Sequence, residues 1–159
     1  MMTARQTAEL IASHGAILTL FARQWCDCPE DAVQDAFCKL VRLKTSPVDV
    51  AAWLFQVVRT TAIDLGRSNR RRQKREARIA RPEHWFDEAE IDGLDAEAAV
   101  AALESLESDI REVIVARIWG GITFEQIAQV AGCSTATAFR RFETGIQLLR
   151  ERLGVLCPK

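Results

Sequence analysis

Residues 122–153, ITFEQIAQVAGCSTATAFRRFETGIQLLRERL, predict two helices joined by a tight turn. Thr123 and Gln126 have the spacing of a capping box, in which each side chain bonds the backbone N–H of the other residue. Gly132 supplies the backbone freedom that a turn between helices favours. Ser134 is suited to cap the second helix. The pattern is typical of a helix-turn-helix, which places its second helix in the major groove of DNA.

The second helix of this pair has a polar outer face that suits contact with DNA. Arg140 can reach guanine edges or phosphates, and Ala136 and Thr137 can contact thymine methyl groups near the helix start. Thr144 lies on the same face. The alternative is an ordinary helical hairpin with a solvated outer face. The glycine and serine at the turn and the small residues that follow favour DNA binding.

The length of 159 residues suits one ordinary domain or two small helical ones. No apolar run approaches the roughly 18 residues that span a membrane. The N-terminal sequence MMTARQTAELIASHG lacks the apolar core and cleavage site of a signal peptide. We therefore expect a cytoplasmic protein that does not insert into a membrane.

The five cysteines are an odd number and suit reduced thiols better than a disulfide framework. Cys26 and Cys28 form only a C-x-C pair, and neither histidine lies at a recognisable zinc spacing. We therefore expect no metal and no cofactor. Cys38 and Cys133 are expected to pack as small apolar side chains.

The net charge of −1 conceals two segments of opposite charge. Residues 67–81 hold eight basic side chains and one acid, whereas residues 83–97 hold seven acids and no lysine or arginine. A partner experiences the local field within roughly 8–10 Å, so the basic segment suits nucleic acid. The acidic segment has the composition of a solvated linker.

The remaining apolar periodicity predicts helices over residues 7–25, 31–43 and 50–65 and a further helical unit from about residue 96. In the second helix we expect Val41 to face inward and Asp31, Gln34, Asp35 and Lys39 to face outward. Gly66 can interrupt the third helix, although the basic sequence after it can also continue the helix.

The same apolar periodicity assigns two further positions. Ile118 is expected in the apolar stripe of the later unit, and Ser108 as a cap within it. Strand signals are absent from the sequence. The predicted fold is all-α, with a helical domain at 1–81, an acidic linker at 82–96 and a helix-turn-helix domain at 97–159.

Three segments of the sequence resemble the small extracytoplasmic-function group of bacterial RNA polymerase sigma factors. Two segments, PEDAVQDAFCKLVR at 29–42 and AAWLFQVVRTTAIDLGRSNRRR at 51–72, are similar to the second conserved region of the family. The segment LESLESDIREVIVARIWGGITFEQIAQVAGCSTATAFRRF at 103–142 is similar to the fourth region. The order and spacing of both regions make the resemblance specific.

The resemblance implies a polymerase-binding face on the helix that begins near residue 31. Asp31, Gln34 and Asp35 match the family positions that bind the clamp helices of the β′ subunit. Spacings of three and four place them on one helical face, where carboxylates can meet basic residues of a partner. The alternative is a solvated acidic face.

The resemblance also implies that the helix over 51–67 and the loop Lys44–Asp49 open the promoter and capture an unpaired base of the element nearest the start site. Phosphate contacts would give this binding a salt-sensitive affinity. Trp53 can equally be a core residue, and the family often has asparagine where this chain has Thr60. The predicted set is Lys44, Asp49, Trp53, Arg59, Thr60, Arg67, Arg70, Arg71 and Arg72.

For the helix-turn-helix, Ser134, Thr137 and Arg141 match the family pattern. The family usually has a basic residue where Phe139 stands, and basic residues or histidine at the positions of Glu143 and Thr144. These departures lower the local positive charge and predict a weaker or differently specific contact with the distant promoter element. The predicted DNA-contacting set is Thr123, Ser134, Thr135, Ala136, Thr137, Arg140, Arg141 and Thr144.

The predicted function is a non-catalytic initiation subunit that directs core RNA polymerase to promoters and opens the DNA strands. The implied partners are the β′ clamp helices and β flap of the polymerase, and promoter DNA in duplex and melted form. In this family, restraint by an anti-sigma factor is common. The sequence shows no nucleophile–base pair, phosphate loop or metal triad. The alternatives are an operator-binding helix-turn-helix regulator and an adaptor that binds only protein.

Overall fold

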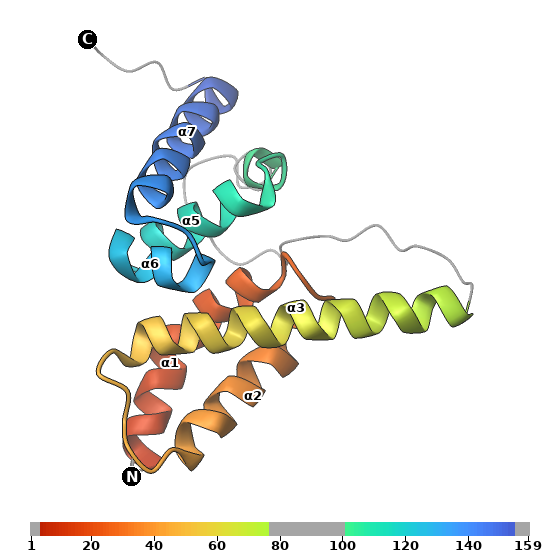
Figure 1. Ribbon diagram of the computed structural model, residues 1–159, viewed down its shortest axis with the longest axis vertical. Coiled ribbons are helices and arrows are strands. Elements are labelled where there is room, and N and C mark those ends of the chain that lie inside the picture. Colours follow the sequence, from red (N-terminus) through yellow and green to blue (C-terminus); the bar gives the residue numbers. More distant parts are fainter. Residues whose placement is uncertain (1–3, 77–100, 155–159) are drawn as a thin grey trace.

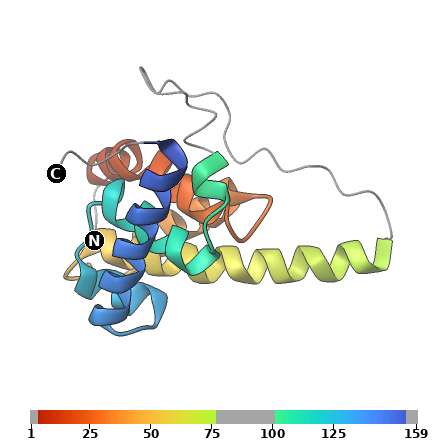
Figure 2. The same cartoon turned by 90° about the horizontal axis from the view of Figure 1, so that it is seen from above.

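The computed structural model describes residues 4–76 and 101–154, and every regular element in these ranges is a helix. The all-α prediction is therefore confirmed for the described chain. We call residues 4–76 the N-terminal half and residues 101–154 the C-terminal half. Figures 1 and 2 show the C-terminal helices stacked on one end of the longest helix, whose other end extends beyond the rest. The helices are α1 (Ala4–Ala22), α2 (Pro29–Arg42), α3 (Val50–Glu76), α5 (Ser108–Ile118), α6 (Phe124–Ala131) and α7 (Thr135–Leu153).

In the N-terminal half, α1, α2 and α3 pack against one another. α2 begins with Pro29 at its first position, where the missing N–H costs no hydrogen bond. Glu30 and Asp31 lie in its first turn and Lys39 and Arg42 in its last, which complements the helix dipole at both ends. The helix predicted at 31–43 is therefore present but begins two residues earlier, and the outward positions predicted for Asp31, Gln34 and Lys39 are confirmed.

α3 runs without interruption through Gly66, so of the two alternatives that the sequence left open at this glycine, the continued helix is the observed one. The reason is a close approach to the chain that follows α1. A Cβ atom built on Gly66 would lie 1.9 Å from the carbonyl oxygen of Trp25. Glycine is therefore required here by packing against a distant segment, and the helix continues because its backbone geometry is unaffected.

In the C-terminal half, the predicted caps of residues 122–153 are confirmed. The Gln126 side chain accepts from the Thr123 N–H at 2.6 Å, and the Thr123 hydroxyl accepts from the Gln126 N–H at 3.3 Å. Gly132 has φ 67° and ends α6 in the left-handed conformation. Ser134 accepts from the Thr137 N–H at 3.1 Å and begins α7. α7 packs on α5 and α6.

The two halves share one hydrophobic core. Buried side chains of α1, α2 and α3, including Phe21 and Phe55, form a single cluster with Val113 and Val115 of α5 and Ile127 of α6. Phe21 and Phe55 meet edge to face with centroids 4.8 Å apart. The halves are therefore joined by apolar packing in addition to the covalent chain.

Two predicted inward positions are wrong, since Val41 is 44% and Ile118 48% exposed. Ile11, on the apolar side of α1, is also 48% exposed. Ile118 is the last residue of α5, and Ile11 and Val41 border a groove that no described element fills. A helical period predicts an apolar side of a helix but not how far a neighbour covers it.

Smaller differences concern helix ends and cysteines. The first helix ends at Ala22, before Trp25, and Glu107 takes the N-cap position of α5, so Ser108 is its first helical residue. Cys133 packs against the core as expected, but Cys38 is exposed, which overturns its assignment as a packed side chain.

Burial raises the pKa of Cys26 to about 11, the value expected of an apolar site beside other thiol and acidic groups. The described cysteines are all free thiols. Within the described residues no group of three potential metal-ligating side chains gathers. None of the described helices is both long enough and apolar enough to cross a membrane. The predicted acidic linker at 82–96 lies outside the described residues, as do both predicted domain boundaries.

We predict that Gly66→Ala destabilises the protein by about 2 kcal/mol, because the added methyl group meets a backbone carbonyl that cannot move without its chain. The matched control is Gly15→Ala on α1, where the new Cβ would lie an ordinary 3.8 Å from Ile11. That change should stabilise the protein by about 0.5–1 kcal/mol through helix propensity. Urea unfolding followed by circular dichroism measures both, and equal effects of the two substitutions would contradict the packing account.

Candidate functional site

The predicted polymerase-binding residues of α2 lie on its outer face, as their spacing requires. Asp31 and Gln34 are exposed. Asp35 is half-buried, pairs with Lys39 at 2.7 Å and lies 3.5 Å from the Thr61 hydroxyl of α3. Asp31 and Gln34 are therefore presented to a partner, whereas Asp35 also links α2 to α3.

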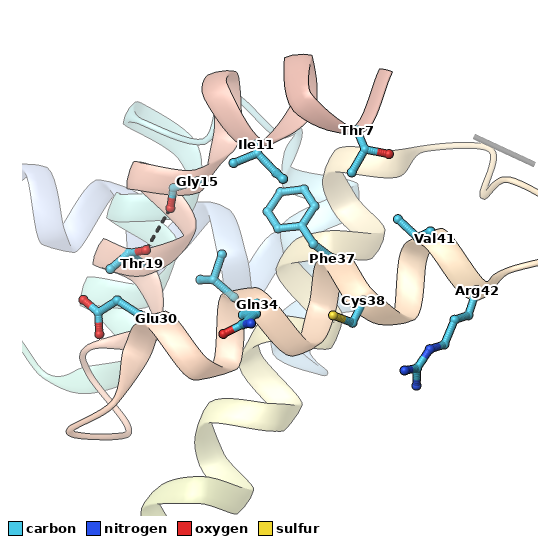
Figure 3. A pocket seen from close by; sticks show the side chains of 11 residues that line it. Thr7, Ile11, Gly15, Thr19, Glu30, Gln34, Phe37, Cys38, Val41 and Arg42 are labelled. Carbon is cyan, nitrogen blue, oxygen red and sulfur yellow. Dashed lines mark hydrogen bonds between the residues drawn. The ribbon is translucent and has the colours of Figure 1, made fainter. Parts of the chain in front are cut away.

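Beside this face lies an apolar groove of about 660 Å³ between α1 and α2 (Figure 3). Ile11 of α1 and Phe37 of α2 form its floor, and Val41 lies towards one end. Gln34 and Glu30 belong to its polar edge, so the groove is continuous with the outer face of α2.

The loop before α3 ends at Asp49, which has two structural partners. Its carboxylate accepts from the Ala52 N–H at 2.8 Å, so it caps α3. The same carboxylate accepts from the side-chain amide of Gln126 on α6. Lys44 in this loop is exposed. Trp53 is half-buried against the core, which supports the core assignment of this side chain.

Arg59 of α3 forms the most buried ion pair of the described chain. Its Nε donates to Glu112 Oε1 at 2.6 Å and its Nη2 to Oε2 at 3.4 Å. The guanidinium carbon also lies 5.5 Å from the centre of the Trp25 ring. The Glu112 side chain is 3% exposed and the Arg59 side chain 28%. Thr60, the next residue, is exposed and bonds to the Gln56 carbonyl of its own helix.

Burial raises the pKa of Glu112 because the ionised carboxylate loses its hydration. The hydrogen bond and the charge of Arg59 lower the pKa but do not offset the whole effect of burial. A buried ion pair of this kind strongly orients its partners even where its net contribution to stability is small.

The basic residues further along α3 lie on the part of the helix that extends beyond the other helices (Figures 1 and 2). Arg70, Arg71 and Arg72 are exposed. Arg67 is 70% exposed and lies 3.9 Å from Asp64 of the preceding turn. This end of α3 therefore carries a concentration of exposed positive charge, which suits a phosphate backbone.

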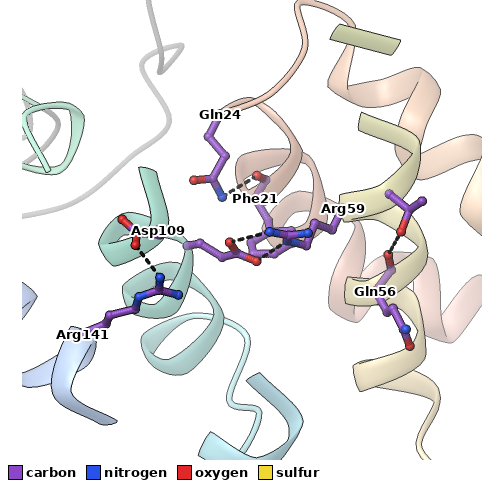
Figure 4. A network of polar contacts seen from close by, with 8 residues as sticks. Phe21, Gln24, Gln56, Arg59, Asp109 and Arg141 are labelled. Atoms are coloured by element: carbon purple, nitrogen blue, oxygen red, sulfur yellow. Dashed lines mark hydrogen bonds and ion pairs between the residues drawn. The ribbon is translucent and has the colours of Figure 1, made fainter. Parts of the chain in front are cut away.

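On α7, the predicted DNA-contacting side chains separate into two groups. Thr135, Ala136, Arg140 and Thr144 are exposed on the outer face. Arg141 instead turns to α5 and pairs with Asp109 at 2.6 Å. Figure 4 shows Arg141 of α7 and Arg59 of α3 approaching α5 from opposite sides.

Phe139, at the position where a basic residue was expected, is 45% exposed and meets Phe124 of α6 edge to face at 5.3 Å. The outer face of α7 therefore presents an aromatic ring beside Arg140, and its positive charge is low.

The sequence prediction missed Glu112 and the contact of Gln126 with Asp49. Glu112 directly follows Arg111 and lies three residues after Asp109, so the sequence around it does not distinguish it from a solvated acid, and only the structure shows that it is buried. Gln126 was assigned to the capping box, which it forms with its carbonyl oxygen while its amide nitrogen contacts Asp49.

Comparisons with known proteins agree with this arrangement. Residues 10–72 match the model of sigma-70 region 2. The chain is 27% identical over 136 residues to the ECF RNA polymerase sigma factor SigK of Mycolicibacterium vanbaalenii, covering 79% of this chain and 69% of that one. The sigma factor RpoE of Bartonella quintana, solved in complex with the anti-sigma factor NepR, has a TM-score of 0.75 and 25% identity over 96% of this chain and 99% of its own.

Residues 10–72 are therefore similar to sigma-70 region 2, and the chain as a whole is similar to sigma factors of the extracytoplasmic-function (ECF) group. CnrH, solved in complex with the cytosolic domain of CnrY, shares the fold of this chain with a TM-score of 0.60. It is 22% identical, and the match covers 98% of this chain and 92% of that one.

We predict a pH dependence for the difference in free energy of unfolding between the wild type and Glu112→Gln. This difference should fall as the pH rises above about 4.5, the ordinary pKa of a glutamate. A pKa that is higher in the folded state means that the folded protein binds more protons than the unfolded chain, so stability is lost as the carboxyl group ionises. Chemical unfolding of both proteins from pH 4 to pH 8 gives this difference. A difference that rises with pH would show that Arg59 outweighs the cost of burial.

Proposed function

We propose that this chain acts as an ECF sigma factor, which binds core RNA polymerase, directs it to a limited set of promoters and opens the DNA strands there. The observation that carries the proposal is the region 2 match over residues 10–72, which includes all of α2 and most of α3. The protein would act as a binding subunit without a catalytic residue of its own. It would work in the cytoplasm, where core polymerase and DNA are found.

Binding to the polymerase is assigned to the outer face of α2. Asp31 and Gln34 are exposed there and suit the basic and polar side chains of the β′ clamp helices. Asp35 would contribute through the side of its carboxylate that Lys39 leaves exposed. The adjoining groove between α1 and α2 adds apolar area, which a polar face alone lacks.

Promoter opening is assigned to α3 and the loop before it. Thr60 and the exposed arginines supply polar and positive groups along α3, and Lys44 adds a positive charge in the loop before it. Arg59 would contact melted DNA once Glu112 no longer holds it. Positive charge along a single strand gives affinity without sequence preference, whereas an unpaired base captured near the loop would give selectivity.

Recognition of duplex DNA is assigned to α6 and α7 as a helix-turn-helix. The confirmed caps at Thr123 and Ser134 and the exposed residues of α7 support this assignment. Arg140 is an exposed cation on α7, whereas Arg141 would hold α7 on α5 through Asp109. The C-terminal half would also contact the β flap of the polymerase.

The domain organisation that fits this division is a promoter-melting domain at 1–81, an acidic linker at 82–96 and a helix-turn-helix domain at 97–159. RpoE of Bartonella quintana was solved with an anti-sigma factor, and we propose that a protein of the same class restrains this chain.

The direct test is transcription with purified core polymerase on a pool of templates whose promoter region is randomised. The chain should select a small set of templates and start transcripts at a fixed distance from a shared sequence. An operator-binding regulator would bind DNA but start no transcript, and an adaptor would do neither. Absence of both polymerase binding and transcription would overturn the proposal.

We predict that Asp31→Lys weakens binding to core polymerase by about tenfold or more, because a like charge then faces the basic partner surface. The matched control is Glu9→Lys on α1, an acid whose side chain is 64% exposed and lies in the same half of the chain. Interferometry on immobilised core polymerase measures both affinities. Equal affinities for the two variants would remove the assignment of this face.

For the basic end of α3, the triple change of Arg70, Arg71 and Arg72 to Ala should reduce the salt dependence of DNA binding by the holoenzyme. Losing three phosphate contacts lowers the slope of log K against log salt by roughly 2–3. The control removes the same charge from exposed arginines elsewhere, by changing Arg5, Arg150 and Arg152 to Ala. A slope that stays at the wild-type value in the first triple variant counts against these contacts.

A further inference from the structure

We propose that Phe139 determines part of the promoter specificity by contacting the C5 methyl group of a thymine in the duplex promoter element. The inference rests on the proposed function, because it takes α7 as the helix that enters the major groove. It goes further by naming one base of the element and the side chain that selects it.

Phe139 belongs to a stripe of exposed side chains on the first turns of α7. Ala136, Phe139, Arg140 and Glu143 are all exposed, and their spacings of three, four and seven place them on one face of the helix. A helix-turn-helix directs the N-terminal part of its second helix towards the base edges of the major groove. The Phe139 ring is therefore among the side chains that a base pair would meet.

Other aromatic side chains hold the Phe139 ring in place. Phe124 of α6 meets Phe139 edge to face with centroids 5.3 Å apart, and it meets Phe142 of α7 at 5.4 Å. The guanidinium carbon of Arg117 lies 4.9 Å from the centre of the Phe124 ring. Phe139 is nevertheless 45% exposed. A ring that is supported on one side loses little conformational freedom when a base packs against its exposed side.

The chemistry of the base edges determines what such a ring can recognise. Amino, carbonyl and N7 groups find no hydrogen-bond partner in a phenyl ring, and covering them without a partner costs free energy. The thymine methyl is the apolar group that the base pairs present in the major groove. Its burial against the ring removes apolar surface from water. Phe139 therefore favours an A·T pair in the orientation that brings the methyl group towards α7.

The neighbouring side chains are less suited to this contact than Phe139. Ala136 carries a single methyl group, so it extends less far from the helix than the ring does. Thr137 is less exposed, and its hydroxyl lies 2.8 Å from that of the Ser134 cap. Arg140 suits a guanine edge or a phosphate, which are polar.

The test uses the holoenzyme and the promoters that it selects from the randomised template pool. Each thymine of their upstream element is replaced in turn by deoxyuridine, which pairs with adenine but lacks the C5 methyl group. At the thymine that Phe139 contacts, we expect the affinity of the wild-type holoenzyme to fall about fourfold, the effect of losing one buried methyl group. Competition against a fluorescein-labelled promoter measures the affinity.

Two variants assign this effect to one residue. Phe139→Ala should bind the thymine and deoxyuridine promoters equally, because the methyl group then has no partner. The matched control is Arg140→Ala on the same exposed face. It should weaken binding to both promoters and keep the difference between them.

A crosslinking measurement needs no substitution in the protein, so it covers the case in which circular dichroism shows that Phe139→Ala fails to fold. 5-Iododeoxyuridine places a photoreactive iodine atom where thymine has its methyl group. Irradiation of the wild-type holoenzyme on this promoter should crosslink the base to Phe139. Mass spectrometry of the crosslinked peptide locates the residue.

Three results would overturn the inference. In the first, the affinity of the wild type does not depend on the methyl group of any thymine in the element. In the others, folded Phe139→Ala keeps the wild-type difference between the two promoters, or the crosslink lies on another residue. The wild type still starts transcripts from its selected promoters in these cases, so the proposed function survives. A wild type that starts no transcript from any template defeats the proposed function, and the inference with it.

Discussion

The structure depends on the contact between the first half of α3 and the helices α5 and α6. Arg59 and Glu112 supply the buried charge pair of that contact, and Phe55 supplies its apolar centre. A buried carboxylate of this kind is tolerated because the guanidinium satisfies both of its oxygens. The same arginine belongs to the helix that we assign to promoter opening. The first half of α3 therefore supplies the contact between the two halves and, in the proposed function, also the surface that meets melted DNA.

Local rules were sufficient wherever the determinants of a helix lie within it. The capping box at Thr123, the left-handed Gly132 and the Ser134 cap were all predicted from neighbouring residues, and all are confirmed. The sequence left open whether α3 continues through Gly66, because the reason for the glycine is the carbonyl of Trp25 in another segment. For the same reason the periodicity of α2 placed Val41 on the apolar side of the helix but did not predict that it is exposed. Its exposure depends on how far α1 extends over it.

For the candidate site, too, the sequence predicted the types of residue that are involved but not the partners that they contact. The sequence and its family resemblance named the arginines and acids that suit DNA and polymerase, and Asp31, Gln34 and the arginines from Arg70 to Arg72 are exposed as such roles require. They did not show that Arg59 and Arg141 each meet an acid of α5. Glu112 lies beside Arg111 in the sequence but pairs with Arg59, 53 residues away, so its role could be recognised only in three dimensions. The position of Glu112 shows that Arg59, one of the predicted DNA-binding residues, is held by an ion pair within the chain.

The most direct measurement is a cryo-electron microscopy structure of this chain with core polymerase on an opened promoter selected in transcription. We expect the two halves to be separated, with Glu112 out of hydrogen-bonding distance of Arg59 and the Arg59 guanidinium on the non-template strand. The outer face of α2 should lie on the β′ clamp helices in the same structure. An opened promoter in which Arg59 still pairs with Glu112 and α6 still covers Asp49 would contradict the account.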